Sequence, residues 1–151
     1  MQQSDRSDKI IGSCFEEVSS LIRNSQPTDE EKGYVTDSFR LKLYGFYKCS
    51  LRGEHSSNHS RPSFFDPVGR AKYDAWVECE GICGDDRVVA MKQYLELASS
   101  VTQTDVGRQC RDMYQTAMKE TEQMQTSPDE NEHTDNTTLK EIDTGCNGIH
   151  K

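Results

Sequence analysis

The sequence predicts an all-helical protein organised as a bundle. Four segments repeat their apolar residues with the 3.6-residue period of an α-helix, and a fifth shows this period more weakly. Most of these segments follow a residue that commonly caps helices. No stretch shows the sustained alternation of apolar and polar residues that predicts strands. Amphipathic helices without a sheet bury their apolar faces against one another, so we expect a helical bundle.

The first helix is expected to begin near Ser7 or Asp8 and to end before Asn24. Its apolar stripe consists of Ile11, Cys14, Phe15, Val18, Leu21 and Ile22. Beyond the helix, Thr28 and Glu31 have the spacing of a capping box, which predicts a short capped turn.

The second helix is expected to begin at Thr36 or Asp37. One face of this helix carries Phe39, Leu43, Phe46 and Ser50. Tyr44 and Lys48 lie roughly opposite that face, and Tyr47 lies on the flank. The second helix therefore carries an aromatic ring and a cation on the face opposite its apolar stripe.

A polar loop, residues 52–63, precedes the third helix. Asp66 is the expected N-cap, Pro67 the first helical residue and Gly81 the end. A narrow strip suited to close packing is formed by Ala71, Ala75 and Cys79, and the adjoining strip by Val68, Lys72 and Trp76.

The fourth helix is expected to begin at Asp85 or Asp86, with Tyr94 at the edge of its apolar stripe. The inward residues of that stripe are Val88, Met91, Leu95 and Ala98. A weaker helical pattern covers residues 105–125. The remainder, residues 126–151, is polar and acidic and is expected to be disordered.

The net charge of −8 argues against nucleic acid as a general partner. Residues 38–78 nevertheless carry seven basic against four acidic side chains, which suggests a local anion site or an ordinary fluctuation among solvated charges. No apolar run is long enough to span a membrane, and the N-terminus does not resemble a signal peptide. We therefore expect a soluble cytoplasmic protein whose six cysteines are reduced.

The candidate binding residues are two lysines and three tyrosines, namely Tyr44, Tyr47, Lys48, Lys72 and Tyr94. Lysines on neighbouring helices can converge on a phosphate, and tyrosines supply a flat ring for a heterocycle and a hydroxyl for a ribose or phosphate. A nucleotide with several phosphates needs this mixture. Solvated lysines and tyrosines at the edge of the core would give the same spacing, so the residues alone leave both interpretations open.

Four segments carry a resemblance to a known family: residues 43–48 (LYGFYK), 61–66 (RPSFFD), 69–76 (GRAKYDAW) and 90–95 (AMKQYL). In order and spacing they are similar to the Leu/Ile-Tyr-x-x-Tyr-Lys, Arg-Pro, Gly-Lys-Ala-Lys-Trp-Asp-Ala-Trp and Ala-Met-x-x-Tyr motifs of acyl-CoA-binding proteins. The resemblance spans about residues 7–102. It implies a four-helix, up-down-down-up bundle with an open groove, extended here by an additional helix at residues 103–125 and the tail at 126–151.

The resemblance also implies a ligand and a site. The 3′-phosphate and adenine of CoA would lie against Tyr44, Tyr47, Lys48 and Lys72, with Tyr94 contributing from the last helix of the bundle. The acyl chain would lie in a groove walled by residues such as Leu41 and the apolar residues of the first helix. The protein would then be a monomeric carrier of medium- to long-chain acyl-CoA, without catalytic activity, cofactor or bound metal.

Two positions depart from the family pattern, because Val68 and Ser19 stand where the family often has lysine. Arg70 is the nearest alternative cation, but it points to a different side of its helix. The connection between the first two helices is also about ten residues longer than in the smallest members of the family. These departures affect the expected affinity more than the class of ligand.

The residues also allow three other interpretations. His55 and His59 with Cys79 and Cys83 could supply zinc ligands, although the order of the ligands is uncommon. An enzyme is not supported, because no nucleophile elbow, glycine-rich phosphate loop or poised carboxylate pair occurs. The helix at 105–125 could dock on a protein partner or pack back on the bundle.

Overall fold

The computed structural model describes residues 2–126, and within them it contains five α-helices and no strand. The helices are α1 (Gln2–Asn24), α2 (Asp37–Ser50), α3 (Pro67–Cys83), α4 (Arg87–Ser99) and α5 (Asp105–Thr126), with short 3-10 turns η1 (Glu31–Gly33) and η2 (Ser56–Asn58). The predicted all-helical class is confirmed. Thr126 ends α5 instead of opening the tail, and the expected disorder of 127–151 lies outside the described residues. None of the helices in the described part is long and apolar enough to cross a membrane.

Local capping explains where three helices begin. The Thr36 side chain accepts a hydrogen bond from the backbone of Phe39, which starts α2. Asp66 caps α3 through Gly69 N, and Asp86 caps α4 through Val88 N and Val89 N. Each cap satisfies a backbone donor that the first turn of a helix leaves free, so these starts agree with the sequence.

Two helix limits differ from expectation by more than one residue. The first helix begins at Gln2 rather than near Ser7, and Gln3 Nε2 donates to the backbone oxygen of Met124 on α5 at 2.6 Å. The expected end of α3 at Gly81 is also wrong, because the helix continues to Cys83. The next residue, Gly84, has a φ of 63°, a left-handed conformation that glycine adopts without steric cost and that stops the helix.

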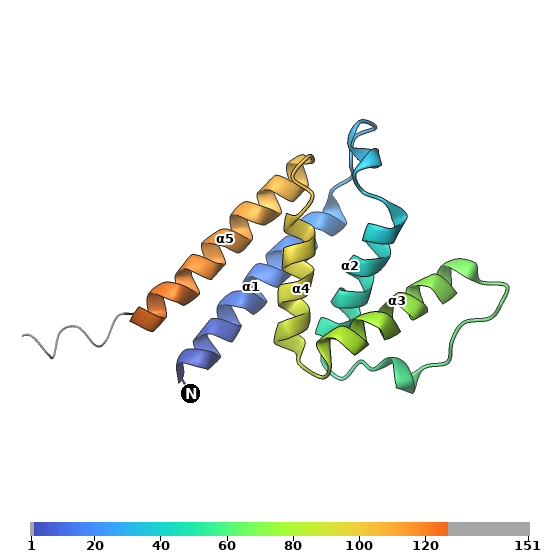
Figure 1. The fold of residues 1–151 in the computed structure, drawn as a ribbon, viewed down its shortest axis with the longest axis horizontal. Coiled ribbons are helices and arrows are strands. Elements are labelled where there is room, and N and C mark those ends of the chain that lie inside the picture. Colours follow the sequence, from blue (N-terminus) through green and yellow to red (C-terminus); the bar gives the residue numbers. More distant parts are fainter. Residues whose placement is uncertain (1, 127–151) are drawn as a thin grey trace, which may run out of the picture.

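The helices form two packed groups that share α4 (Figure 1). α2 lies across α3 and also packs on α4, whereas α1, α4 and α5 all pack on one another. α5 returns along α1 in the opposite direction, so the start of α1 lies beside the end of α5 (Figure 1). This arrangement agrees with the interpretation that the fifth helix packs back on the bundle.

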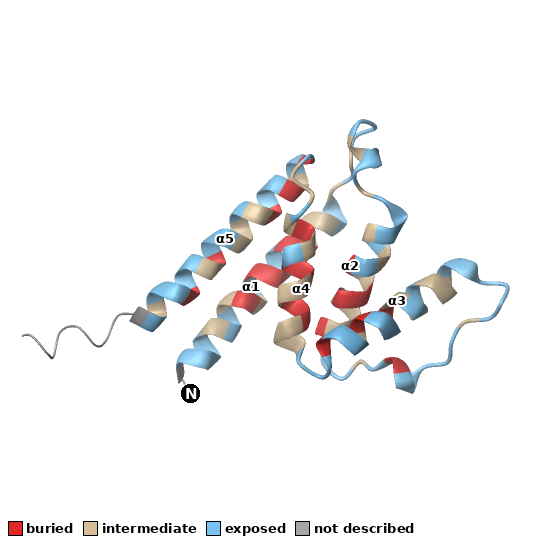
Figure 2. Cartoon of the chain, viewed as in Figure 1, coloured by how far each residue is buried: buried red, intermediate tan, exposed pale blue. Residues whose placement is uncertain are grey.

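The core lies where α1, α2, α4 and α5 meet, and Figure 2 shows the buried residues concentrated on their facing sides. Its buried members include Ile11, Phe15, Val18, Leu43, Phe46, Ala90, Leu95, Ala98, Cys110 and Ala117. These residues repeat at helical spacing along their helices, as the apolar stripes of the sequence predict.

The loop between α2 and α3 is fastened to α3. Glu80 accepts a hydrogen bond from Ser56 N at 2.8 Å, and Arg61 pairs with the Asp74 carboxylate through two bonds of 2.9 and 2.7 Å. The Tyr73 hydroxyl donates to the backbone oxygen of Ser56. These bonds hold the loop beside the surface on which the predicted lysines lie.

Candidate ligand-binding site

Close contact between α2 and α3 brings the two predicted lysines to neighbouring positions. A Cβ atom added to Gly45 of α2 would lie 2.5 Å from Cys79 Sγ and 2.6 Å from the backbone oxygen of Ala75. Glycine therefore lets the two helices approach more closely than any other residue would. The narrow Ala75–Cys79 strip predicted for close packing is the surface that meets Gly45.

Lys72 of α3 reaches across this contact to α2. Its Nζ lies 5.4 Å from the centre of the Tyr44 ring, within the range of a cation–π interaction. Lys72 is exposed, and Tyr44 is half-buried. The structure thus joins two of the five predicted site residues and leaves the Lys72 ammonium open to solvent.

Lys48 of α2 also contacts α3, at Trp76, one helical turn after Lys72. Its Nζ is 4.5 Å from the centre of the Trp76 ring and 3.5 Å from Glu54 Oε2. The same carboxylate oxygen lies 3.4 Å from His59 Nε2. Only 20% of the Lys48 side chain is exposed, so an anion that bound Lys48 would compete with Glu54 for its ammonium.

Tyr47 and Tyr94 form an aromatic group with Phe15 of α1. The Tyr47 and Phe15 rings stack with their centroids 5.9 Å apart. The Tyr94 ring meets Phe15 edge-on, with centroids 5.1 Å apart, and its centroid lies 6.3 Å from that of Tyr47. Tyr94 is only 4% exposed, so it belongs to the core and not, as the sequence predicts, to its edge. Burial raises the pKa of the Tyr94 hydroxyl above its ordinary value.

Arg23 is a cation beside Tyr47 that the sequence analysis did not identify. Its Nη1 donates a hydrogen bond of 3.4 Å to the Tyr47 hydroxyl, and its guanidinium lies 6.0 Å from the Tyr47 ring centre. Arg23 lies one helical turn after Ser19, the position at which the family often has lysine. That spacing was visible in the sequence, but only the tertiary structure, in which α1 and α2 both pack on α4, shows that Arg23 reaches Tyr47.

The two departures from the family pattern lie in very different surroundings. Val68 is 64% exposed, one turn before Lys72, and a cation there would stand in solvent beside the predicted site. Ser19 is 3% exposed, and its hydroxyl donates to the backbone oxygen of Glu16. Arg70 does not replace a cation at Val68, because it lies 5.8 Å from the ring centre of Phe64 on the preceding loop.

The four residues of the alternative zinc site are not gathered into one group in the described part of the chain. Among residues 2–126, no group of three or more His, Cys, Asp or Glu side chains lies close enough to hold a metal ion. His59 faces the Trp76 ring at 5.4 Å, and His55 is exposed. Cys79 is buried and donates to the backbone oxygen of Lys42. His59 and Cys79 thus make contacts with different partners.

The buried cysteines are poor nucleophiles. Burial, with nearby acidic side chains as a smaller contribution, raises the pKa of Cys14 to about 11. Burial likewise raises the pKa of Cys79 and of Cys110 to about 11, and that of Cys49 to about 12. Because the thiolate is the reactive form, these side chains are almost wholly unreactive thiols at neutral pH.

The fold and these side chains define a class of protein: an all-helical bundle in which cations contact tyrosines of α2 from neighbouring elements, Lys72 at Tyr44 and Arg23 at Tyr47. The family model described as acyl CoA binding protein matches residues 13–98, more than half of the chain. The chain therefore belongs to the acyl-CoA-binding protein family. Members of this family bind acyl-CoA and are generally binding proteins without enzymatic activity.

Curated relatives support the same family. The chain is 53% identical over 70 residues to acyl-CoA-binding domain-containing protein 5A of Danio rerio, which covers 46% of this chain and 13% of that protein. It is 33% identical over 91 residues to acyl-CoA-binding domain-containing protein 5 of Gallus gallus, and this match covers 58% of this chain and 16% of that protein. It is 36% identical over 61 residues to acyl-CoA-binding protein homolog 1 of Caenorhabditis elegans, and this match covers 40% of this chain and 65% of that protein. The match thus spans a small part of the two longer relatives.

Proposed function

We propose that this protein binds medium- to long-chain acyl-CoA esters as an intracellular carrier and buffer, with Tyr44, Tyr47, Lys48, Lys72 and Tyr94 forming the site. The observation that carries the proposal is the placement of Lys48 and Lys72 on adjacent helices, each beside an aromatic ring. Two cations on adjacent helices, each beside a flat ring, suit the 3′-phosphate and adenine of CoA.

The five residues have different roles in this proposal. Lys72 and Lys48 attract the phosphates, and Tyr44 offers a half-buried ring to the adenine. Tyr47 offers its ring and hydroxyl from the neighbouring turn of α2. Tyr94, buried against Tyr47, contributes by fixing the position of that ring. Arg23 joins them as a further cation beside Tyr47.

The acyl chain supplies the affinity that the nucleotide alone lacks. Burying one methylene group is worth about 0.8 kcal/mol, so a partly buried long chain contributes several kcal/mol. Loss of chain and ligand motion offsets part of this gain. Phosphate contacts weaken with added salt, whereas burial of the chain does not. Affinity is therefore expected to rise with chain length at any salt concentration.

Titration calorimetry with palmitoyl-CoA, octanoyl-CoA and free CoA tests the proposal. We expect the tightest binding for palmitoyl-CoA and the weakest for free CoA. Equal affinity for free CoA and palmitoyl-CoA would overturn the acyl part of the proposal. No binding by the folded protein would overturn the whole, and would favour an interaction scaffold on the same fold, weakened as a binder by Val68 and Ser19.

A further inference from the structure

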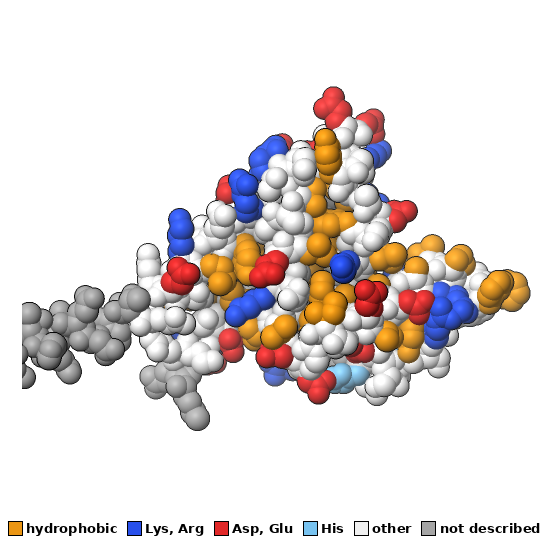
Figure 3. Space-filling model, viewed as in Figure 1, with side chains coloured by type: hydrophobic (Ala, Val, Ile, Leu, Met, Phe, Trp, Pro, Cys, Tyr) orange, Lys and Arg blue, Asp and Glu red, His pale blue; other side chains and the backbone are white. Residues whose placement is uncertain are grey.

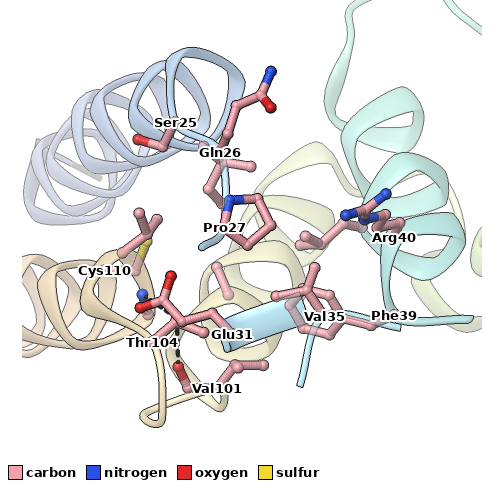
Figure 4. A pocket seen from close by; sticks show the side chains of 15 residues that line it. Ser25, Gln26, Pro27, Glu31, Val35, Phe39, Arg40, Val101, Thr104 and Cys110 are labelled. Atoms are coloured by element: carbon pink, nitrogen blue, oxygen red, sulfur yellow. Dashed lines mark hydrogen bonds between the residues drawn. The ribbon is translucent and has the colours of Figure 1, made fainter. Parts of the chain in front are cut away.

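A cavity of about 380 Å³ lies between the end of α1, the connection to α2, the start of α2 and the junction of α4 with α5. Its lining residues are Ile22, Ser25, Gln26, Pro27, Glu31, Val35, Phe39, Arg40, Leu43, Ala98, Val101, Thr104, Val106, Gly107 and Cys110. Figure 4 shows Cys110 of α5 on one side of it and Val35 and Phe39 on the other. Its volume falls within the range of about 300–1,000 Å³ that is usual for small-molecule sites.

Most of the side chains that line the cavity are apolar, and two of its polar side chains, Glu31 and Thr104, already have hydrogen-bond partners within the protein. The Glu31 carboxylate accepts hydrogen bonds from Thr28 N at 3.1 Å and from Asp105 N at 3.0 Å. The Thr104 hydroxyl donates to Val101 O at 3.1 Å and accepts from Gly107 N at 2.9 Å. An apolar group gains free energy by leaving water for the apolar part of this lining.

One wall of the cavity lies outside the part of the chain that matches the family. The match ends at residue 98, and Val101, Val106 and Cys110 come from the segment beyond it. A second wall is the connection between α1 and α2, which carries Pro27 and Val35. Glu31 ties these two walls together through Asp105 N. Two walls of the cavity are therefore formed by the segment that includes α5 and by the connection between α1 and α2.

The cavity borders the proposed acyl-CoA site on two helices. On α1, Ile22 lines the cavity and the next residue, Arg23, contacts Tyr47. On α2, Arg40 lines the cavity, and Tyr47 lies seven residues further, two turns or about 10 Å along the same face. Figure 3 shows hydrophobic side chains in a band along the boundary of α2 and α4 on the side of the connection.

We propose that this cavity receives the far end of the acyl chain of a long-chain acyl-CoA. The inference rests on the proposed function and adds to it a place for the chain end, built by α5. A short chain stays near Tyr47 and Arg23, whereas a long chain passes Arg40 and enters the space between Val35 and Val106. The cavity thus makes α5 part of the selection for chain length.

Spin-labelled ligands test the position of the chain end. Methyl-labelled protein is titrated with stearoyl-CoA that carries a doxyl group near the chain end or near the carboxyl group. We expect the end label to broaden the methyl resonances of Ile22, Val35 and Val106 more strongly than the label near the carboxyl group does. If the bound end label leaves all three sharp, the inference is wrong, even though acyl-CoA binding stands.

Filling the cavity gives a second test. Val106→Trp and, from the opposite wall, Val35→Trp should each weaken palmitoyl-CoA binding about tenfold or more, because a few chain methylenes lose their burial, while octanoyl-CoA binding stays unchanged. Val77→Trp is the control, since Val77 is an exposed residue of α3 away from the cavity. Unchanged palmitoyl-CoA affinity in both folded cavity variants would overturn the inference, and absence of acyl-CoA binding by the wild type would overturn the proposed function itself.

Discussion

The Lys48 ammonium lies 4.5 Å from the centre of the Trp76 ring, and the Glu54 carboxylate holds it there at 3.5 Å. The lysine that the proposal assigns to phosphate thus already has an acidic partner and an aromatic surface. Glu54 belongs to the loop that is fastened to α3 through Glu80 and Asp74. In the proposed site, a phosphate that binds Lys48 would therefore replace the Glu54 carboxylate.

Replacing both proposed phosphate ligands should weaken binding strongly. For Lys48→Ala with Lys72→Ala we expect a loss of about a hundredfold or more in palmitoyl-CoA affinity, because hydrogen bonds to charged groups are worth about 1.5–3 kcal/mol each. Calorimetry measures the loss. The matched control is Lys42→Ala with Lys119→Ala, which removes two exposed lysines from α2 and α5. Equal losses in the two pairs would show a general effect of charge and no specific site.

Removing the internal competitor should have the opposite effect. Glu54→Gln frees Lys48 from its acidic partner, so we expect free CoA to bind about two- to fivefold more tightly, in line with the 0–1 kcal/mol typical of partly exposed ion pairs. The gain should shrink as salt is added. Glu78→Gln on exposed α3 surface controls for net charge. Weaker binding by Glu54→Gln alone would contradict the exchange described above.

The two positions that lack the family lysine should respond differently to its restoration. Val68→Lys places a cation on exposed surface one turn from Lys72, so we expect tighter acyl-CoA binding without a change in thermal stability. Ser19→Lys places a charge at a buried position, and we expect a clear loss of stability. Thermal unfolding followed by circular dichroism, with calorimetry for binding, separates the effects. Equal stability of the two variants would contradict the burial of Ser19.

Two glycines offer a matched test of the α2–α3 contact. Gly45→Ala forces a methyl group against Cys79 and Ala75, so we expect a loss of about 1–3 kcal/mol in the free energy of unfolding. Gly12→Ala on α1 meets no atom within 4 Å, and we expect it to stabilise the helix by about 0.5–1 kcal/mol. Urea titration measures both. A neutral Gly45→Ala variant would mean that α2 and α3 are not in close contact.

Glu31 should make the attachment of α5 depend on pH. Hydrogen bonds from Asp105 N and Thr28 N lower the pKa of Glu31 below its ordinary value. A carboxyl group with a lowered pKa in the folded state contributes stability above its unfolded pKa, and this contribution disappears as the pH falls through the folded value. The melting temperature of the wild type should therefore exceed that of Glu31→Gln near neutral pH, and the difference should shrink in acid. Glu30→Gln, next in the chain and exposed, should show no such trend.

Much of the fold could be predicted because its causes are local. Thr36, Asp66 and Asp86 cap the residues that follow them within three positions, and the apolar stripes depend only on helical spacing. The candidate residues Tyr44 and Lys72 were identified in the same way, and their contact agrees with the expected closeness of their helices. The end of α3 was missed because both Gly81 and Gly84 can stop a helix, and only Gly84 has the positive φ.

The sequence by itself determined the helical class, most helix starts and the resemblance to the family, since these follow from neighbouring residues and from motifs in order. Only the tertiary structure decided that Tyr94 is buried, that Arg23 contacts Tyr47 and that α5 closes a cavity against the α1–α2 connection. These features depend on which side chains meet when helices distant in the chain pack together. Helical spacing tells which face of a helix is apolar, but it carries no information about the partner that covers that face.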